Sequence, residues 1–418
     1  MELQKLQKDA NTIIENIIKE NLPGKAVEKA LKTHNFKSDK VYLVAIGKAA
    51  YTMAKAAANF LGDKLEKGII VTKYDHAGEP IENIDIYEAG HPVADENSVK
   101  ATEKCIELAE SLTENDELVF LVSGGGSAIF EKPGEGVTLD DIIGVTDKLL
   151  KSSADIIEIN MIRKRLSAVK AGRFAEIAAP AKVFAIILSD VLGDRLDTIA
   201  SGPAVPDMST SEDALDVLSK YNLEVSNVIL ENLKIETPKS ITNVETVITG
   251  SVKTLIDSAA NAASELGYKP YILTNTLNCE AKEAGRFLST IANDTLRGDT
   301  HFEIPCAIIA GGETVVNIIG EGKGGRNQEK ALSFAAGVSG QGGLLFFSLG
   351  SDGTDGPTDA AGGIVTGQTA IQLKERDIDI NEVLKNNDSY NALKEVDSLI
   401  MTGPTGTNVN DVCVILID

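Results

Sequence analysis

Short apolar runs rich in Val, Ile and Leu recur along the chain, separated by longer stretches with an apolar residue every three or four positions. The runs do not alternate between apolar and polar residues, which is typical of parallel strands covered on both faces. We therefore predict buried strands joined by amphipathic helices. The clearest predicted strands are 41–46, 68–71, 118–122, 183–188, 246–249, 271–274, 306–309, 344–348 and 412–416, and the clearest helices are 98–112, 139–151, 211–221, 253–266 and 328–337.

The alternation of strands and helices over 418 residues predicts an α/β protein with two Rossmann-like domains and mainly parallel sheets. A polar segment at 230–244 contains Pro238 and has no periodicity, so it is the best candidate for a domain boundary. We accordingly predict one domain over 1–237 and a second over 238–418.

The composition narrows the class of partner. Forty Lys and Arg stand against 62 Asp and Glu, a formal charge of −22. Nucleic acid and anionic membranes need a positive face, so neither is an expected partner, whereas a small anion needs only a local basic pocket. The N-terminus has no signal-peptide pattern and no stretch approaches a membrane span. Four isolated cysteines indicate reduced core residues, and the sequence predicts a cytoplasmic protein.

Glycines cluster just after the predicted strands, where ligands bind in open α/β sheets. Lys48 follows the first strand, at the positive end of the next helix, where a cation is unfavourable unless an anion joins it. A Lys that simply extends into water is the alternative. Three glycines between Ser123 and Ser127 follow another strand. Their backbone N–H groups could point together at an anion, or the glycines could merely form a tight turn.

Two further segments of the first half carry charge. Between Asn160 and Arg173 the chain has five cations and no acid, and on one helix Arg163, Lys170 and Arg173 would share a face suited to phosphate or carboxylate. A solvated face is the ordinary alternative. Asp190 follows the strand at 183–188, where it could hold Mg²⁺, accept a proton or only cap a helix.

The second half repeats this pattern. Gly311, Gly312 and Glu313 are predicted to join two strands, and a glycine-rich turn then presents Arg326 at the start of a helix, a combination suited to phosphate or carboxylate. Asp352 and Asp355 lie in a Gly-rich loop that could bind Mg²⁺ or a hydroxyl, or be only a turn. No nucleophilic triad is indicated. Gly turns, cations and single carboxylates at strand ends are typical of phosphoryl transfer.

These segments form a recognisable series. Over residues 46–411 the chain resembles the glycerate kinases of the second class, the family with a C-terminal MOFRL domain. The motifs that carry the resemblance, in the family's order, are IGKAA, GHPVADENS, SGGGSA, RKRLSAVKAGR, SDVLGD with IASGP, GGET, GKGGRNQE, SDGTDGPTDAAGG and TGPTGTNVND. The resemblance implies phosphorylation of D-glycerate at its 2-hydroxyl by ATP and Mg²⁺, in a cleft between two α/β domains. We expect a monomer or homodimer.

The resemblance also implies roles for individual residues. Lys48, Arg326 and Asp190 would be catalytic. Nucleotide and its phosphates would be bound by Ser123, Gly124, Gly125, Gly126, Ser127, Gly311, Gly312, Glu313, Thr405 and Asn408; glycerate by Arg163, Lys170, Arg173 and Asn327; and metal by Asp190, Asp352 and Asp355.

Two other functions stay open. A nicotinamide-dependent hydroxypyruvate reductase would need G-x-G-x-x-G between a strand and a helix, with an acid about twenty residues on, and the chain has neither in that context. A non-catalytic protein that binds a sugar acid is the third possibility. It would leave the many charged groups at strand ends without a reaction to serve.

Overall fold

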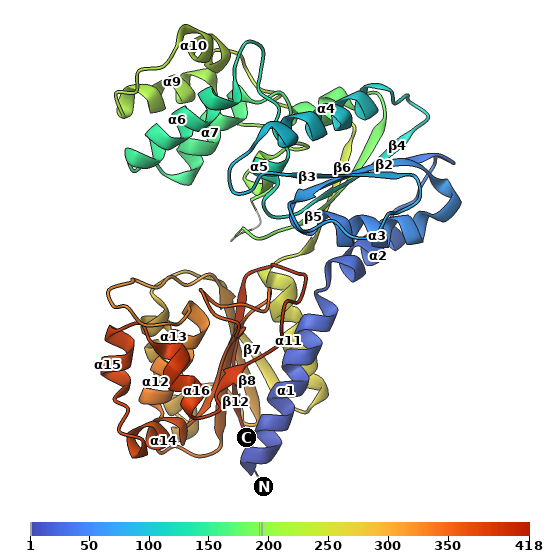
Figure 1. The fold of residues 1–418 in the computed structure, drawn as a ribbon. Helices are drawn as coiled ribbons and strands as arrows, with labels where there is room; N and C mark the ends of the chain where they lie inside the picture. The colour runs from blue at the N-terminus through green and yellow to red at the C-terminus, as the bar shows by residue number, and fades with distance from the viewer. Residues whose placement is uncertain (1, 192, 194) are drawn as a thin grey trace. The chain divides into compact units, whose positions relative to one another are not determined.

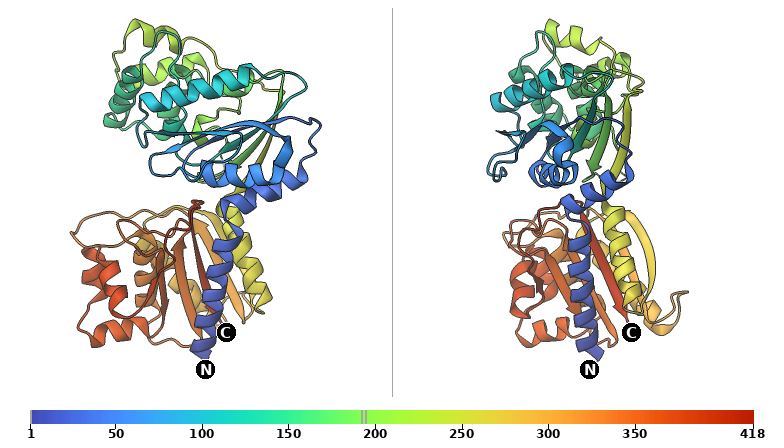
Figure 2. Two further views of the ribbon diagram at one scale, coloured as in Figure 1. Left: turned by 45° about the vertical axis from the view of Figure 1, so that its right-hand side comes forward. Right: turned by 90° about the vertical axis from the view of Figure 1, so that its right-hand side faces the viewer.

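The computed structural model describes residues 2–191, 193 and 195–418, and these fall into two compact units. The N-terminal unit is Pro23–Thr249. The C-terminal unit is Gly250–Asp418 together with the N-terminal residues up to Leu22. In Figure 1 the blue helix α1 (Glu2–Glu20) accordingly lies beside the yellow helix α11 (Val252–Glu265), and Figure 2 shows the same from two further sides.

The N-terminal unit contains a six-stranded sheet whose order is β3-β2-β1-β4-β5-β6. Its pairs from β3 through β5 are parallel, and the order reverses between β1 and β4. In such sheets the reversal opens a crevice at the carboxyl ends of the two strands. The strands are β1 (Val41–Ile46), β2 (Leu65–Lys73), β3 (Ile84–Ala89), β4 (Glu117–Val122), β5 (Lys182–Leu188) and β6 (Val244–Gly250).

The helices of this unit pack around two apolar cores. One core lies on the sheet, where the rings of Phe120, Phe130 and Phe174 meet at centroid distances of 4.9–6.1 Å. The other lies among α6, α7, α9 and α10. The helices are α2 (Pro23–Thr33), α3 (Ala50–Leu61), η1 (Gly62–Lys64), α4 (Glu96–Glu110), α5 (Gly126–Ile129), α6 (Leu139–Lys151), α7 (Ile156–Leu166), α8 (Arg173–Ile177), η2 (Ile199–Ser201), α9 (Ser211–Lys220) and α10 (Asn227–Leu233).

The C-terminal unit has a mixed sheet with the order β11-β10-β9-β12-β8-β7. Its last strand, β12, inserts between β8 and β9 and runs antiparallel to both. Its elements, besides α1 and α11, are β7 (Lys269–Leu277), α12 (Ala281–Arg297), β8 (Cys306–Gly312), α13 (Arg326–Gly337), β9 (Leu344–Gly350), β10 (Gly362–Thr366), α14 (Thr369–Glu375), α15 (Ile380–Lys385), α16 (Ser389–Glu395), β11 (Leu399–Ile400) and β12 (Asp411–Ile417).

The predicted α/β class is confirmed, and every strand and helix predicted with a residue range is present. Mainly parallel pairing holds for the first sheet only, because the chain returns through β12 into the middle of the second. The structure adds β3, which is half-exposed and partly polar, and the short strands β10 and β11. The second strand predicted after Glu313 is wrong. Asn387 instead holds that segment, accepting bonds at Oδ1 from the backbone N–H groups of Ile319 and Gly320.

The boundary predicted at 237/238 falls inside the N-terminal unit, because the segment around Pro238 packs back onto that unit. The backbone N–H of Asp207 donates to the Pro238 carbonyl at 3.0 Å, and β6 then joins the first sheet. At the other end of the chain, α1 belongs to the C-terminal unit, where Tyr268 donates to the buried Asp9 carboxylate at 2.8 Å. Both differences come from contacts between residues far apart in sequence.

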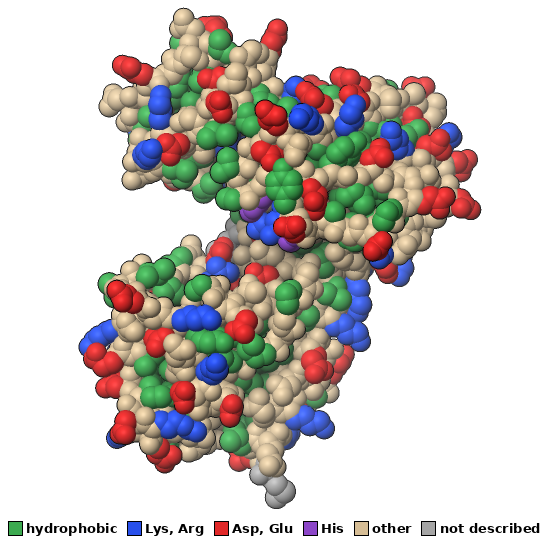
Figure 3. Space-filling view, in the orientation of Figure 1, with side chains coloured by type: hydrophobic (Ala, Val, Ile, Leu, Met, Phe, Trp, Pro, Cys, Tyr) green, Lys and Arg blue, Asp and Glu red, His purple; other side chains and the backbone are tan. Residues whose placement is uncertain are grey.

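The remaining expectations from composition concern cysteines, membrane spans and charge. Cys105, Cys306 and Cys413 are buried free thiols, as predicted, whereas Cys279 is exposed. Among the residues that the structure describes, no helix has the length and apolar character needed to cross a bilayer. On the face drawn in Figure 3, acidic and basic side chains are intermixed, so the net charge of −22 does not gather there into one acidic block.

The assignment of α1 to the C-terminal unit predicts where a substitution in it will act. Ile13 is fully buried, and α1 packs on α11 and β9. Ile13→Ala should lower the free energy of unfolding by about 2–5 kcal/mol, because it removes buried methyl groups and leaves a cavity. Hydrogen exchange followed by mass spectrometry should then show faster exchange in α11 and β9, with residues 23–249 unchanged. Leu3→Ala, at a side chain that is 45% exposed, is the control and should change neither quantity. Faster exchange confined to 23–249 would contradict the assignment.

Candidate functional site

The crevice between β1 and β4 in the N-terminal unit brings together two of the predicted segments. Lys48 follows β1 and the three glycines follow β4, and the Lys48 backbone N–H donates to the Gly124 carbonyl at 2.9 Å. Ser123 ties the turns, since its hydroxyl donates to the Ile46 carbonyl and accepts from the Ala49 backbone N–H, both at 3.1 Å. The order of the strands therefore places Lys48 against the glycine loop.

Asp190 lies against the same loop. It follows β5, the neighbour of β4, and a side-chain carbon added to Gly124 would stand 2.0 Å from the Asp190 carboxylate oxygen Oδ2. No larger residue fits at position 124 unless this carboxylate or the loop moves. Glycine at this position is thus a condition for the carboxylate to reach the loop. The structure brings together Lys48, Gly124 and Asp190, as the sequence predicts.

Two histidines lie beside Lys48. The ring nitrogen Nδ1 of His76 lies 3.2 Å from the Lys48 carbonyl, and the His91 ring and the Lys48 side chain both approach Gly125. Burial lowers the pKa of His91, and the charges of Lys48 and Lys73 lower it further. Neither histidine is among the site residues predicted from the sequence. His91 lies in the quoted motif GHPVADENS, but nothing in its spacing indicates a contact with Lys48.

Ser127 and Arg163 lie next to this loop, and Lys170 is buried in an ion pair. The Ser127 hydroxyl is 3.0 Å from that of Ser201, and its carbonyl accepts from Arg163 Nη2 at 3.1 Å. Burial lowers the pKa of the half-buried Arg163. Lys170 is fully buried and pairs with Glu131, and burial lowers the pKa of its ammonium to about 8. The ion pair, rather than a ligand, is thus the partner that the structure provides for Lys170.

The single helical face predicted for Arg163, Lys170 and Arg173 does not exist. Helix α7 ends at Leu166, and α8 begins only at Arg173. The Arg173 guanidinium donates to the carbonyls of Lys164 and Ser167, at 2.7 and 2.9 Å, and so satisfies acceptors at the end of α7. Arg173 thus has a structural role, and its predicted contact with substrate stays a prediction.

In the C-terminal unit, the carboxyl ends of β8 and β9 meet the start of β12 at one edge of the sheet. Asp411, the first residue of β12, pairs with Gly312 on one side and with Gly350 on the other. Arg326 at the start of α13 binds this buried carboxylate through two bonds, Nε to Oδ2 at 2.6 Å and Nη2 to Oδ1 at 3.0 Å. Nη1 donates to the Glu313 carboxylate at 2.8 Å.

Arg326 keeps capacity for a ligand. Burial works against its charge, but Asp411 and Glu313 outweigh this effect and raise its pKa above the ordinary value. The three bonds use three of the five N–H groups of a guanidinium. Arg326 also lines a pocket of about 540 Å³ that lies within the C-terminal unit. The predicted anion-binding role of Arg326 is compatible with this geometry.

Asp352 and Asp355, predicted as metal ligands, have different surroundings. Asp355 is buried and accepts from the backbone N–H groups of Asn327 and Gln328, at 2.8–3.1 Å, so its carboxylate caps α13. Burial raises the pKa of Asp355 to about 7 against these bonds. Asp352 is half-buried and lines the pocket. Asp355 lines the same pocket, and Asp352 is the more exposed of the two.

Other predicted binding residues of this unit serve the packing. The Asn327 side chain is buried and accepts from the Ser348 hydroxyl at 2.6 Å, and its predicted contact with glycerate stays a prediction. Gly312 has φ +156° and passes so close to β7 that a side-chain carbon would lie 2.2 Å from the Leu277 carbonyl oxygen. Gly311 packs in the same way against α11. Thr405 bonds to the Ser351 carbonyl, whereas Asn408 is half-buried beside the start of β12.

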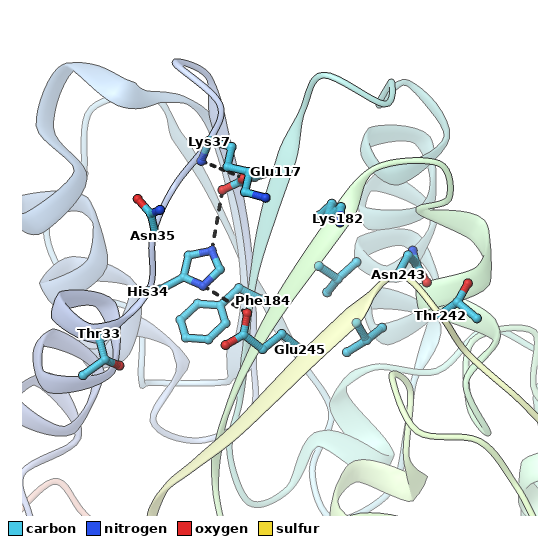
Figure 4. Close-up of a pocket in the computed structure, with 12 residues that line it drawn as sticks. Thr33, His34, Asn35, Lys37, Glu117, Lys182, Phe184, Thr242, Asn243 and Glu245 are labelled. Atoms are coloured by element: carbon cyan, nitrogen blue, oxygen red, sulfur yellow. Dashed lines mark hydrogen bonds and ion pairs between the residues drawn. The ribbon is translucent and has the colours of Figure 1, made fainter.

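A second pocket lies at the opposite edge of the first sheet, at the amino ends of β4 and β5 (Figure 4). His34 lies there between two carboxylates, 3.6 Å from Glu117 and 3.3 Å from Glu245, and its ring stacks on Phe184 at 4.0 Å. Ligands of open α/β sheets bind at the carboxyl ends of strands, so the crevice at Lys48 and the pocket at Arg326 are the better candidates.

Cations, glycine-rich turns and single carboxylates lie at the strand ends of the two sheets. These groups define an α/β protein that is equipped to bind a small anionic ligand. Residues 9–234 match a family described as Domain of unknown function (DUF4147), and residues 306–411 match the MOFRL family. A D-glycerate 2-kinase from Thermotoga maritima is 54% identical, and the alignment covers 99% of each chain. The crystal structure of a glycerate kinase from Thermotoga maritima superposes with a TM-score of 0.97, over 99% of this chain and 100% of that one.

A third relative, from Agrobacterium vitis, is named as a hydroxypyruvate reductase. It is 40% identical and aligns over 90% of this chain and 86% of its own length. The chain belongs to the glycerate kinase family with a C-terminal MOFRL domain.

The ion pair at Asp411 predicts a stability effect. Arg326→Met would leave the Asp411 carboxylate, 1% exposed, without its cation. The free energy of unfolding, measured in urea, should fall by about 3–5 kcal/mol. Arg326→Met combined with Asp411→Asn should recover most of this loss. Glu313→Gln alters a half-exposed partner of the same guanidinium and should cost less than about 1 kcal/mol. Equal losses in Arg326→Met and Glu313→Gln would count against this account.

Proposed function

We propose that the protein is a glycerate 2-kinase, which transfers the γ-phosphoryl group of ATP to the 2-hydroxyl of D-glycerate and yields 2-phosphoglycerate and ADP. The observation that carries the proposal is the cluster at the β1/β4 crevice, where Lys48 and Asp190 both lie against Gly124. A cation and a carboxylate beside a backbone loop are the groups that phosphoryl transfer requires, since its catalysis is positioning and neutralisation of charge. The family supports the same reaction.

In the proposed reaction, the 2-hydroxyl oxygen of glycerate attacks the γ-phosphorus, and the bond to the oxygen that bridges the β- and γ-phosphates breaks. Asp190 accepts the hydroxyl proton. Lys48 stabilises the negative charge on the transferred group. Arg326, with two N–H groups beyond its three bonds, binds phosphate or the glycerate carboxylate.

The family also implies Mg²⁺. Among the residues that the structure describes, no group of three or more His, Cys, Asp or Glu side chains is arranged to hold a metal ion. Mg²⁺ in kinases is usually held by one or two carboxylates together with phosphate oxygens and water. Asp190 and Asp352, each at the end of a strand, fit that smaller requirement. The ion would neutralise charge on the phosphates.

One observation favours a nicotinamide-dependent reductase: the strand order β3-β2-β1-β4-β5-β6 is that of dinucleotide-binding sheets. The glycine-rich turn that such sheets use to bind the dinucleotide is missing after β1. After β1 the chain has a single glycine, Gly47, and then Lys48, so no G-x-G-x-x-G loop can approach a pyrophosphate. The interdomain cleft, the cytoplasmic location and the monomeric or homodimeric state stay predictions.

A ³¹P NMR time course with protein, MgATP and D-glycerate tests the reaction. We expect a resonance of 2-phosphoglycerate that grows together with ADP. Formation of 3-phosphoglycerate would keep the kinase class but contradict the position. No phosphorylated product, with consumption of NADH by hydroxypyruvate, would establish the reductase instead. Binding of glycerate without either turnover would favour the non-catalytic protein.

The role of Lys48 predicts a selective loss of activity. Lys48→Ala removes the cation from the crevice and should lower kcat by about 10²- to 10³-fold, because a preorganised charge on the transferred group is lost. Its thermal midpoint should stay close to that of the unaltered protein, since the contacts of Lys48 with Gly124 and His76 involve its backbone. Lys55→Ala, at an exposed Lys on the following helix α3, is the matched control and should keep full activity. Similar kcat values for both variants would remove Lys48 from the proposed mechanism.

A further inference from the structure

The pocket beside Arg326 contains two buried polar atoms that the fold leaves without partners. Glu329 and Thr314 both line it, and they are 2% and 1% exposed. Within the described part of the chain, neither Oε1 of Glu329 nor Oγ1 of Thr314 makes a hydrogen bond. Buried polar atoms without partners are rare and costly, so their presence in a pocket calls for an explanation. A ligand that donates a hydrogen bond would supply one.

The Glu329 carboxylate is held in a fixed position. Its other oxygen, Oε2, accepts from the Asn387 side-chain amide at 3.2 Å. Burial raises the pKa of Glu329, whereas the bond from Asn387, the charge of Lys282 and the backbone N–H of Lys282 oppose this rise. Asn387 also fixes the loop above the pocket, because its oxygen accepts from the backbone of Ile319 and Gly320. Oε1 is therefore a preorganised acceptor.

Part of the exposed lining of this pocket is apolar. Val315 and Ile318 line the pocket and are 51% and 82% exposed. Pro357, in the loop that follows β9, lines it as well. Exposed apolar side chains that gather at a pocket mark a surface for an apolar partner. A volume of about 540 Å³ far exceeds what a three-carbon acid needs and lies in the range of pockets for larger ligands.

The pocket thus offers exposed apolar side chains, a buried acceptor and, at Arg326, a cation with N–H groups to spare. The aromatic base, the hydroxylated sugar and the phosphate chain of a nucleotide are the chemical groups that these three features would bind. We propose that this pocket binds the nucleoside part of ATP, with a ribose hydroxyl donating to Oε1 of Glu329. Carboxylates bind ribose hydroxyls in the same way in other α/β nucleotide sites. The inference rests on the proposed kinase function for the identity of the nucleotide, but its test does not depend on turnover.

Binding of the non-hydrolysable analogue β,γ-imido-ATP, measured by isothermal titration without glycerate, tests the site directly. In Glu329→Gln the amide oxygen is needed by Asn387, so an NH₂ donor replaces the acceptor at the position of Oε1. We expect the Kd to rise about tenfold to a hundredfold, as for loss of a hydrogen bond to a charged group. Glu321→Gln, at an exposed acid in the chain segment before α13, is the control and should leave the Kd unchanged.

Ile318→Ser provides a second variant in which folding is not at risk, because the side chain is 82% exposed. It should also weaken binding of the analogue, without a change in thermal midpoint. Unchanged affinity in both Glu329→Gln and Ile318→Ser would overturn the proposal, even if the protein phosphorylates glycerate. Weaker binding in both variants would support it, even if no phosphorylated glycerate forms.

Kinetics with ribose analogues identifies the contact. In the unaltered protein, 2′-deoxy-ATP or 3′-deoxy-ATP should show a KM at least about tenfold above that of ATP, and Glu329→Gln should abolish this preference. The KM for glycerate should not change. A rise in the KM for glycerate alone would place glycerate in the pocket and overturn the proposal. Equal use of ATP and both deoxy analogues by the unaltered protein would overturn the ribose contact.

Discussion

The bidentate ion pair between Arg326 and Asp411 is the interaction on which the C-terminal unit depends most. It joins the start of α13 to the start of β12, residues 85 apart in sequence, at distances of 2.6 and 3.0 Å. A carboxylate that is 1% exposed needs a cation close by, because burial without one costs several kcal/mol. The pair therefore fixes where α13 begins relative to the sheet. The pocket wall that contains Arg326 and Glu329 follows from that position.

The N-terminal unit depends on a steric constraint rather than on an ion pair. At the β1/β4 crevice, three turns approach so closely that Gly124 has no room for a side chain beside Asp190. The same approach brings the Lys48 backbone within hydrogen-bond distance of the loop. Both units thus place charged groups where strands end and helix N-termini begin, an arrangement that favours anionic ligands. The two units achieve this with different sheets, one parallel and one mixed.

Several cations of the site region make contacts that stabilise the fold. Lys170 forms a buried pair with Glu131, and Arg173 satisfies carbonyls at the end of α7. Buried charges of this kind are expensive to leave unpaired, so they hold their partners firmly. Arg163 bonds to the Ser127 carbonyl and thereby connects this framework to the glycine loop. Such residues can affect a reaction through position without touching a substrate.

The sequence alone was sufficient for the α/β class, the long buried strands and the location of Lys48, Gly124 and Asp190 at strand ends, because apolar runs and glycine turns are local signals. It also sufficed for the family, through motifs in a specific order. The tertiary structure alone decided the insertion of β12 between β8 and β9, the place of α1 on α11 and the partners of Lys170 and Asn327. These depend on contacts between distant residues, which no local pattern encodes. The acceptor at Glu329 was likewise decided by the tertiary structure. Asn387, which is distant in sequence, bonds to one carboxylate oxygen of Glu329 and leaves the other without a hydrogen bond to any residue that the structure describes.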